Sequence, residues 1–318
     1  MKTAVVLNGC SPSLDQQIEE INGFLSSYLS SDFEIEVWIL THQKINKAEL
    51  KGIIQTDYIG LVQTNTGYLP EDFLDALQRM FSIRKPELIV FGSSSYAKEL
   101  SARLAYRLKG SSCIGVNSCR IKDGKFLVEK EVYSNHLTAR FILKKVPCCI
   151  SITKGFRTER DILECLPEFE VISGDAEKVY SWIKSYHSCQ KENAAGLETA
   201  SVVVAVGRGI GCKENIGSIA AFAESMNAKL GASRPVVMSA WTEMDKLIGA
   251  SGTITAPSVC IALGISGAAA FAVGIEKSTW IVAVNKDEKA PIFKMADIGI
   301  IDDYNEVVQE LTKLLSKK

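Results

Sequence analysis

The stretch from Pro257 to Asp303 constrains the fold more than any other part of the chain. Val259 to Leu263 is a short apolar run, and a turn rich in glycine and serine follows it. This pattern predicts a buried parallel strand that opens into a helix near Gly267. The first amides of such a helix favour an anion, and the small side chains let a phosphate approach the backbone. The glycines have a second explanation, which is close packing of a helix on a strand.

A second strand is predicted at 279–284, and it ends in the polar residues Asn285, Lys286 and Asp287. The final strand is expected at 298–301, and a helix follows it to Leu315. Because ligands of open α/β sheets bind at the carboxyl ends of the strands, these polar groups are expected to lie at a ligand site.

The same half of the chain opens with a buried strand, 201–206, followed by Gly207-Arg208-Gly209-Ile210-Gly211 and a helix at 215–228. The dinucleotide fingerprint G-x-G-x-x-G is incomplete, because Cys212 stands where its third glycine belongs. Another dinucleotide therefore fits better than NAD. The planar guanidinium of Arg208 suits a pyrophosphate. Arg234 precedes a predicted short strand, and 248–252 is a flexible loop with a hydroxyl group.

The first half alternates predicted strands, at 3–7, 33–40, 58–63 and 88–91, with predicted helices, at 13–29, 69–83 and 95–108. The turn Gly92-Ser93-Ser94-Ser95 lacks the lysine of a P-loop, so helix capping is favoured over a nucleotide site. Asp123-Gly124 predicts a hairpin, and the apolar runs up to 152 predict an antiparallel addition to the parallel sheet.

A charged helix is expected at 176–191, and a polar connection at 192–200 marks the domain boundary. The predicted domains are 1–195 and 196–318. The fold class is α/β, with a mostly parallel sheet flanked by helices in each domain. The first domain carries the antiparallel hairpin region, and the second is doubly wound.

Composition excludes several classes of protein. The net charge of −1 gives no reason to expect nucleic acid or an anionic membrane as partner. No segment has the length of a membrane span or the pattern of a signal peptide, so we expect a cytoplasmic protein without membrane insertion. The nine cysteines form no C-x-x-C pair, which disfavours a metal centre, and no catalytic Ser/His/Asp or Cys/His set is evident.

These residues resemble the alpha subunit of electron transfer flavoproteins, over essentially the whole chain. The resemblance rests on motifs in the order and spacing of that family: Val-Gly-Arg-Gly at 206–209, Gly-Ala-Ser-Arg at 231–234, Gly-x-Ser-Gly at 249–252, Ala-Pro at 256–257, Ala-Leu-Gly-Ile-Ser-Gly-Ala at 262–268, Val-Asn-Lys-Asp at 284–287 and Ala-Pro-Ile-Phe at 290–293. The first domain matches more loosely, through the helix at 98–105.

The resemblance implies noncovalent FAD in the second domain and a heterodimer with the electron transfer flavoprotein beta subunit, which the first domain would contact. Such proteins pass electrons between dehydrogenases, such as an acyl-CoA dehydrogenase, and an acceptor, so the chain is expected to be an electron carrier rather than an enzyme with its own substrate. The cofactor-binding residues implied by the resemblance are Arg208, Ser233, Arg234, Ile248, Gly249, Ala250, Ser251, Ser266, Gly267, Ala268, Ala269, Ala270, Phe271, Asn285, Asp303 and Tyr304.

Within that set, the resemblance places Arg208 at the FAD phosphates, Arg234 against the isoalloxazine ring and Ser251 near the flavin N5. It places residues 266–268 near the pyrophosphate, and it assigns the adenosine end to Asn285, Asp303 and Tyr304.

The chain departs from the family at three positions. Ala250 replaces a usual glutamine, Phe271 replaces a usual histidine near the flavin O2, and Met238-Ser239-Ala240 replaces Asp-Ala-Gly. All three histidines of the chain precede residue 201. A second hypothesis is therefore a flavin-poor paralogue that acts as a structural or regulatory partner of a beta-like subunit. An NAD-dependent enzyme is disfavoured, because no acid/base pair can be assembled.

Overall fold

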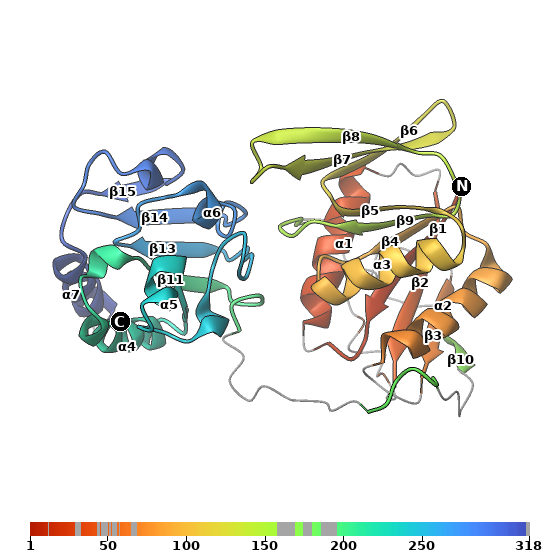
Figure 1. Cartoon of the computed structure of the whole chain (residues 1–318), viewed down its shortest axis with the longest axis horizontal. Helices are drawn as coiled ribbons and strands as arrows, with labels where there is room; N and C mark the ends of the chain where they lie inside the picture. Colours follow the sequence, from red (N-terminus) through yellow and green to blue (C-terminus); the bar gives the residue numbers. More distant parts are fainter. Residues whose placement is uncertain are drawn as a thin grey trace. The chain divides into compact units, whose positions relative to one another are not determined.

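The computed structural model describes the chain apart from residues 12, 29–32, 43–44, 46–49, 51, 53–55, 57, 65–68, 158–168, 174–179, 186–195 and 316–318. The chain forms two compact units, residues 1–189 and 190–318 (Figure 1). Among the described residues, no helix combines the length and apolarity needed to cross a membrane. The same residues contain no group of three or more histidine, cysteine or acidic side chains that could hold a metal ion.

The first unit is built on a seven-stranded parallel sheet with the order β10-β3-β2-β1-β4-β9-β5. Its strands are β1 (Lys2–Asn8), β2 (Glu34–Thr41), β3 (Tyr58–Gln63), β4 (Leu88–Phe91), β5 (Ser111–Val116), β9 (Cys148–Ile152) and β10 (Phe169–Ser173). Successive side chains of β1 enter different cores, since Val5 and Leu7 pack with one cluster and Ala4 and Val6 with the other.

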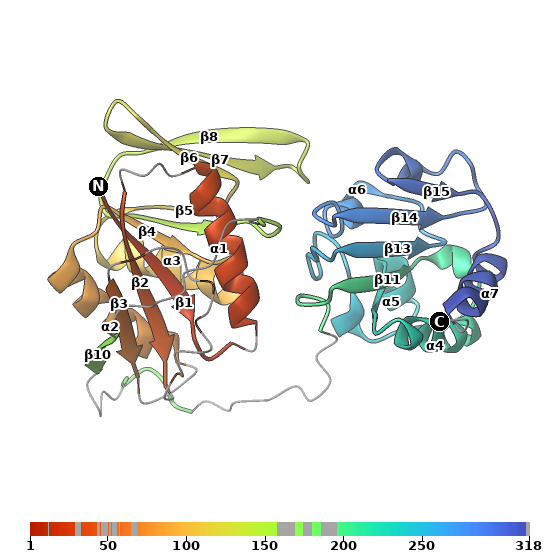
Figure 2. The same cartoon turned by 180° about the vertical axis from the view of Figure 1, so that it is seen from behind.

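Three helices cover this sheet. The amphipathic helix α1 (Leu14–Tyr28) packs on one face through Ile18, Ile21 and Phe24, whereas α2 (Pro70–Arg84) and α3 (Ser95–Arg107) pack on the other (Figures 1 and 2). Ser94 caps α3 by accepting a hydrogen bond from the Ala97 amide, as the capping interpretation of the Gly/Ser turn predicts.

The predicted hairpin is confirmed. β6 (Ser118–Lys122) and β7 (Lys125–Val132) pair in antiparallel fashion around Asp123 and Gly124, which both have positive φ as a tight two-residue hairpin turn requires. β8 (Leu137–Leu143) completes a separate three-stranded sheet. The prediction that the antiparallel run continues to 152 is wrong, because β9 lies between β4 and β5 and is parallel to both.

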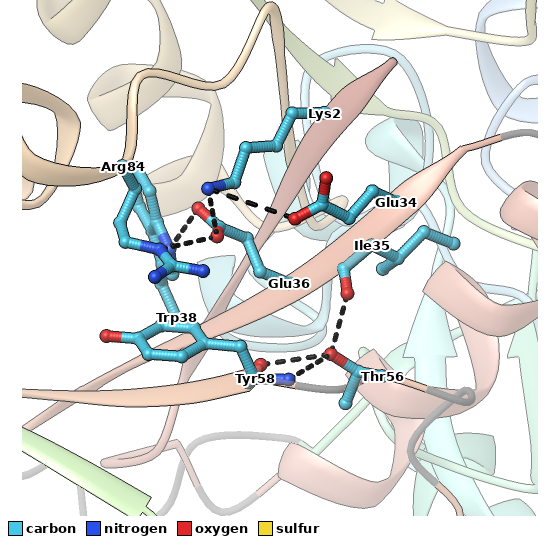
Figure 3. Close-up of polar contacts among 8 residues, drawn as sticks. All are labelled: Lys2, Glu34, Ile35, Glu36, Trp38, Thr56, Tyr58 and Arg84. Atoms are coloured by element: carbon cyan, nitrogen blue, oxygen red, sulfur yellow. Dashed lines mark hydrogen bonds and ion pairs between the residues drawn. The ribbon is translucent and has the colours of Figure 1, made fainter.

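A buried ion cluster joins the first two strands to the end of α2 (Figure 3). The Glu36 carboxylate is almost completely buried and accepts hydrogen bonds from Trp38 Nε1 at 3.0 Å and Arg84 Nε at 2.8 Å. Lys2 Nζ lies 3.3 Å from the same carboxylate. The Arg84 guanidinium stacks 3.9 Å from the centre of the Tyr58 ring, so the cluster also holds β3.

The second unit contains a five-stranded parallel sheet with the order β12-β11-β13-β14-β15. Its strands are β11 (Val202–Val206), β12 (Lys229–Ala232), β13 (Val259–Leu263), β14 (Trp280–Val284) and β15 (Ile298–Ile300). The helices α4 (Ile216–Ser225) and α7 (Tyr304–Leu315) pack on one face, and α6 (Ala269–Ala272) contributes Phe271 to the core on the other. The strand order 2-1-3-4-5 is that of a doubly wound sheet.

Two further predicted elements differ in the structure. The residues after Arg234 form a short helix, α5 (Arg234–Met238), and the strand β12 precedes them. Pro235 explains the difference, because proline suits the first turn of a helix. Residues 180–185 of the predicted helix 176–191 are turn and irregular structure, and the other positions of that helix lie outside the described residues.

Candidate functional site

A cavity of the second unit lies at the carboxyl ends of its strands. It has a volume of about 660 Å³ and is lined by the loops that follow β11, β12, β13 and β14. The chain leaves β11 toward β12 on one side and returns to β13 on the other, so the switch point lies between β11 and β13. Ligands of doubly wound sheets bind at this position, and the cavity volume is in the usual range for a cofactor site.

Glycines bring the two loops at the switch point into backbone contact. The Gly209 amide donates a hydrogen bond to the Gly264 carbonyl at 2.9 Å. A Cβ on Gly207 would lie 2.2 Å from that carbonyl oxygen, and Gly264 has a φ of +60°. Close packing of two loops thus explains these three glycines, whereas the sequence had suggested close packing of a helix on a strand for Gly264.

Two arginines supply the positive charge of the cavity wall. Arg208 begins the short 3-10 helix Arg208–Ile210, and Arg234 begins α5. Ser233, at the N-cap of α5, is buried, and its amide donates a hydrogen bond to the Val206 carbonyl at 2.9 Å. Both guanidiniums are exposed and come from neighbouring loops, so together they suit a ligand with phosphate groups.

The predicted helix start near Gly267 contributes less than the sequence indicated. α6 spans only the four residues Ala269–Ala272 and has Ala268 at its N-cap. A single turn has a small dipole, so the case for an anion here rests on the arginine side chains. The Gly267 backbone, with a φ of +86°, lies against Ile292, whose amide donates a hydrogen bond to the Ser266 carbonyl at 3.0 Å.

The loop at 248–251 packs against α6 and forms an apolar part of the wall. The Ala250 amide donates a hydrogen bond to the Ala270 carbonyl at 2.7 Å. Gly249 has a φ of +132°, and a Cβ there would lie 2.4 Å from the same oxygen. Phe271 lines the cavity, although its side chain is only 6% exposed. The phenyl ring is thus held by the core rather than standing free in the cavity.

Asn285 connects two loops of the site. Its Nδ2 donates a hydrogen bond to the Ile265 carbonyl at 2.9 Å, and its Oδ1 accepts one from the Asp287 amide at 3.0 Å. Asn285 therefore shapes the cavity through the backbone as well as lining it. Asp287 also lines the cavity and is its acidic side chain.

Two of the predicted residues lie at the start of α7 and are not among the residues that line the cavity. Asp303 accepts a hydrogen bond from the Asn305 amide and pairs with Lys286 Nζ at 2.8 Å, which together hold the pKa of its carboxyl below the usual value. The Tyr304 hydroxyl donates a hydrogen bond to the Ile210 carbonyl at 3.1 Å. A role at the adenosine end of a cofactor stays a prediction for both.

The structure brings most of the predicted residues together. The cavity is lined by Arg208, Ser233, Arg234, Ile248, Ser251, Ser266, Ala268, Ala270, Phe271 and Asn285. It is not lined by Gly249, Ala250, Gly267, Ala269, Asp303 or Tyr304. Lining residues that were not predicted as site residues include Pro235, Ile265, Asp287, Ala290 and Pro291. The motifs Val-Asn-Lys-Asp and Ala-Pro-Ile-Phe contain three of these five, so a signal for them was present in the sequence.

The side chains that line the cavity fit FAD in kind. The Arg208 guanidinium suits the pyrophosphate, and that of Arg234 suits a ring that gains negative charge on reduction. The hydroxyl groups of Ser251 and Ser266 offer neutral hydrogen bonds. Ile248, Ile265 and Phe271 give an apolar wall for a flat ring system.

Comparison with known proteins identifies the same region. A family model described as the electron transfer flavoprotein FAD-binding domain matches residues 196–276. A second one, the electron transfer flavoprotein domain, matches residues 57–169 of the first unit.

Three similar proteins cover most of the chain. Putative electron transfer flavoprotein subunit YgcQ of Escherichia coli (strain K12) is 31% identical over 284 residues, which are 87% of this chain and 97% of that protein. Lactate dehydrogenase (NAD(+),ferredoxin) subunit LctC of Acetobacterium woodii is 29% identical over 85% of this chain and 62% of its own length. Protein FixB of Escherichia coli O9:H4 (strain HS) is 31% identical over 72% of this chain and 74% of that protein.

The predicted resemblance is thereby confirmed, and with it the two-domain α/β fold and FAD as the cofactor. The chain belongs to the electron transfer flavoprotein family, as an alpha-type subunit with an FAD-binding domain.

Proposed function

We propose that the cavity at the β11/β13 switch point holds FAD and that the chain carries electrons between dehydrogenases and an acceptor. The observation that carries the proposal is the convergence of Arg208 and Arg234, from two loops, on one cavity. Bound FAD would supply the redox chemistry, because it accepts and releases electrons at its ring. The protein would supply binding, orientation and charge.

Each lining residue has a proposed role in this site. Arg208 would pair with the pyrophosphate through its planar guanidinium, and Arg234 would place a fixed positive charge beside the ring. Ser251 would donate a hydrogen bond to the ring. Phe271 and Ile248 would exclude water, which strengthens the effect of the arginines because screening is weaker in a less polar site.

The partner is proposed to be a beta-type subunit, bound mainly by residues 1–195, while residues 196–318 hold the cofactor. The match of residues 57–169 to the electron transfer flavoprotein domain supports this division. The donor is proposed to be a dehydrogenase, such as an acyl-CoA dehydrogenase. The relative LctC is named as a lactate dehydrogenase subunit, which supports a dehydrogenase more generally. The proposal also includes a cytoplasmic location.

A second candidate function is that of a flavin-poor structural partner of a beta-like subunit. The position of Phe271 favours it, since this side chain forms part of the cavity wall where the family usually has histidine. The arginines argue against it, because a structural paralogue has no need of two guanidiniums on the wall of an empty cavity.

Titration with FAD tests the role of the arginines. The chain is purified with its beta-type partner, stripped of flavin and titrated, with the flavin fluorescence as readout. Because a hydrogen bond to a charged group contributes about 1.5–3 kcal/mol, Arg208→Ala should raise the Kd for FAD by roughly 10- to 150-fold.

Lys229→Ala is the matched control. Lys229 is exposed at the start of β12, at the opposite end of the strands from the cavity, so its loss should leave the Kd unchanged. Equal Kd values for Arg208→Ala and the unsubstituted chain would refute the assigned role. Failure of the unsubstituted chain to bind FAD at all would favour the structural partner.

A further inference from the structure

A cysteine and a histidine meet at the carboxyl edge of the sheet in the first unit. Cys10 follows β1 and His42 follows β2, and these strands are adjacent and parallel, with Asn8 opposite Leu40. Cys10 Sγ lies 2.9 Å from His42 Nδ1. This contact is within hydrogen-bonding distance, so the thiol can pass its proton directly to the ring nitrogen.

The turn that carries Cys10 is fixed by hydrogen bonds. The Cys10 amide donates to Asn8 Oδ1 at 3.1 Å, and the Asn8 amide in turn donates to Gln17 Oε1 at 3.2 Å. The Gly9 amide donates to the Leu40 carbonyl at 2.8 Å, which ties the turn to β2. The pair is therefore oriented by the backbone of both strands, as a reactive site requires.

The pair spans β1 and β2, next to the switch point of the sheet, which lies between β1 and β4. The chain passes from β1 to β2 on one side, and β4 lies on the other side of β1. Tyr96 follows in the first turn of α3, and its hydroxyl oxygen is buried and makes no hydrogen bond within the described part of the chain. Burial raises the pKa of this hydroxyl, and negative charge on Cys10 adds to the rise.

We propose that Cys10 and His42 form a nucleophilic thiol–imidazole pair that is modified by small, soft electrophiles. The sulfur would form a bond to the electrophilic carbon, whose bond to the leaving group breaks, and the leaving group departs as an anion. The thiol proton would pass to His42 Nδ1, so that an imidazolium and a thioether remain. No oxidant or reductant takes part.

His42 is required by this chemistry because the thiol is not ionised by its surroundings alone. Burial raises the pKa of Cys10, and hydrogen bonds from the His42 backbone and the Thr41 side chain oppose the rise only in part. A thiol with a raised pKa is a weak nucleophile unless a base takes its proton. The half-buried position of Cys10 restricts the site to small reagents.

Cys113 provides a matched comparison within the same chain. It lies on β5, it is half-buried like Cys10, and burial likewise raises the pKa of its thiol. The charged side chain that acts on it is that of Lys130, not a histidine. A difference in reactivity between the two thiols therefore reports the histidine rather than burial.

The test uses the full-length chain with its bound flavin and iodoacetamide as the probe, at pH 7.5. Peptide mass spectrometry follows the alkylation of each cysteine over time. Because a positioned base accelerates a reaction about 10²-fold or more, Cys10 should be alkylated at least tenfold faster than Cys113. His42→Asn should bring the rate at Cys10 to within about threefold of the rate at Cys113, since only the base is lost.

Several outcomes decide the proposal. Equal rates at Cys10 and Cys113, or an unchanged rate at Cys10 in His42→Asn, would overturn it. Thermal unfolding of each variant is compared with the unsubstituted chain, and His42→Gln is measured if His42→Asn unfolds early. The site is built wholly from the first unit, so its test is independent of FAD binding in the second.

Discussion

The buried ion cluster around Glu36 predicts an asymmetry between two substitutions. The Glu36 side chain is 1% exposed, whereas those of Arg84 and Lys2 are 26% and 23% exposed. If the anion is removed, both cations still reach water. If Arg84 is removed, the carboxylate stays buried and retains Lys2 and Trp38 as partners. Removing the Arg84 cation should therefore lower the free energy of unfolding more than removing the Glu36 anion.

The magnitudes follow from the contacts. Removing one partner of a buried ion pair lowers the free energy of unfolding by about 3–5 kcal/mol. Because Lys2 remains, we expect a loss of roughly 2–4 kcal/mol for Arg84→Met. Glu36→Gln keeps an oxygen that can accept the hydrogen bond from Trp38, so its expected cost is about 1–2 kcal/mol. The double variant should cost less than the sum of the two single variants, since Arg84 and Glu36 are in direct contact.

Hydrogen exchange of the β1 and β2 amides measures the free energy of unfolding of the first unit separately from the second. Gln78→Met is the control, because Gln78 is exposed on the same helix, and its expected effect is within about 0.5 kcal/mol. A cost for Glu36→Gln equal to or greater than that for Arg84→Met would refute the reasoning.

Three further substitutions and one control test other parts of the account. Burial raises the pKa of Glu20, whose carboxylate accepts a hydrogen bond from Ser93 Oγ at 2.5 Å. The folded chain then binds more protons than the unfolded chain above the usual pKa of about 4.3, so stability falls as pH rises. Glu20→Gln should gain stability relative to the unsubstituted chain at pH 7.5 and lose that gain at pH 4 in denaturation curves. Gly264→Ala should lower the melting temperature of the second unit and abolish FAD binding, because a Cβ would lie 2.7 Å from the Gly209 carbonyl carbon. Gly217→Ala, in open space on α4, should not lower the melting temperature. Phe271→His should raise the flavin midpoint potential, because an added positive charge would stabilise the two-electron reduced form. Each 1.4 kcal/mol of that stabilisation corresponds to about 30 mV. An unchanged potential in a redox titration would contradict this.

Local patterns predicted many of the elements of the first unit. The hairpin predicted at Asp123-Gly124 is present in the structure. The strands predicted at 58–63 and 88–91 have the same bounds as β3 and β4. Strand partners were harder to predict. β9 is buried on both faces, so its apolar run lacks the alternation that marks a half-exposed antiparallel strand. β5 was missed, because Ser111, Ser112 and Gly115 are weak strand formers.

The site itself was predicted through motifs rather than through periodicity. Arg208, Arg234 and Ser251 come from three loops that only the folded sheet brings to one cavity. The sequence did not indicate that α6 is a single turn, since its alanines favour a longer helix. Nor did it indicate that Asn285 holds the Ile265 carbonyl, because that contact depends on the adjacent positions of β13 and β14.

The flavin content of the purified chain tests the central claim most directly. The chain is isolated with its beta-type partner, its visible absorption spectrum is recorded, and the flavin released by denaturation is identified and quantified against protein. The account predicts an oxidised flavin spectrum and one FAD per alpha-type chain. It also predicts a lower FAD content for the Arg208→Ala variant. A colourless complex that takes up no FAD on reconstitution would contradict the account.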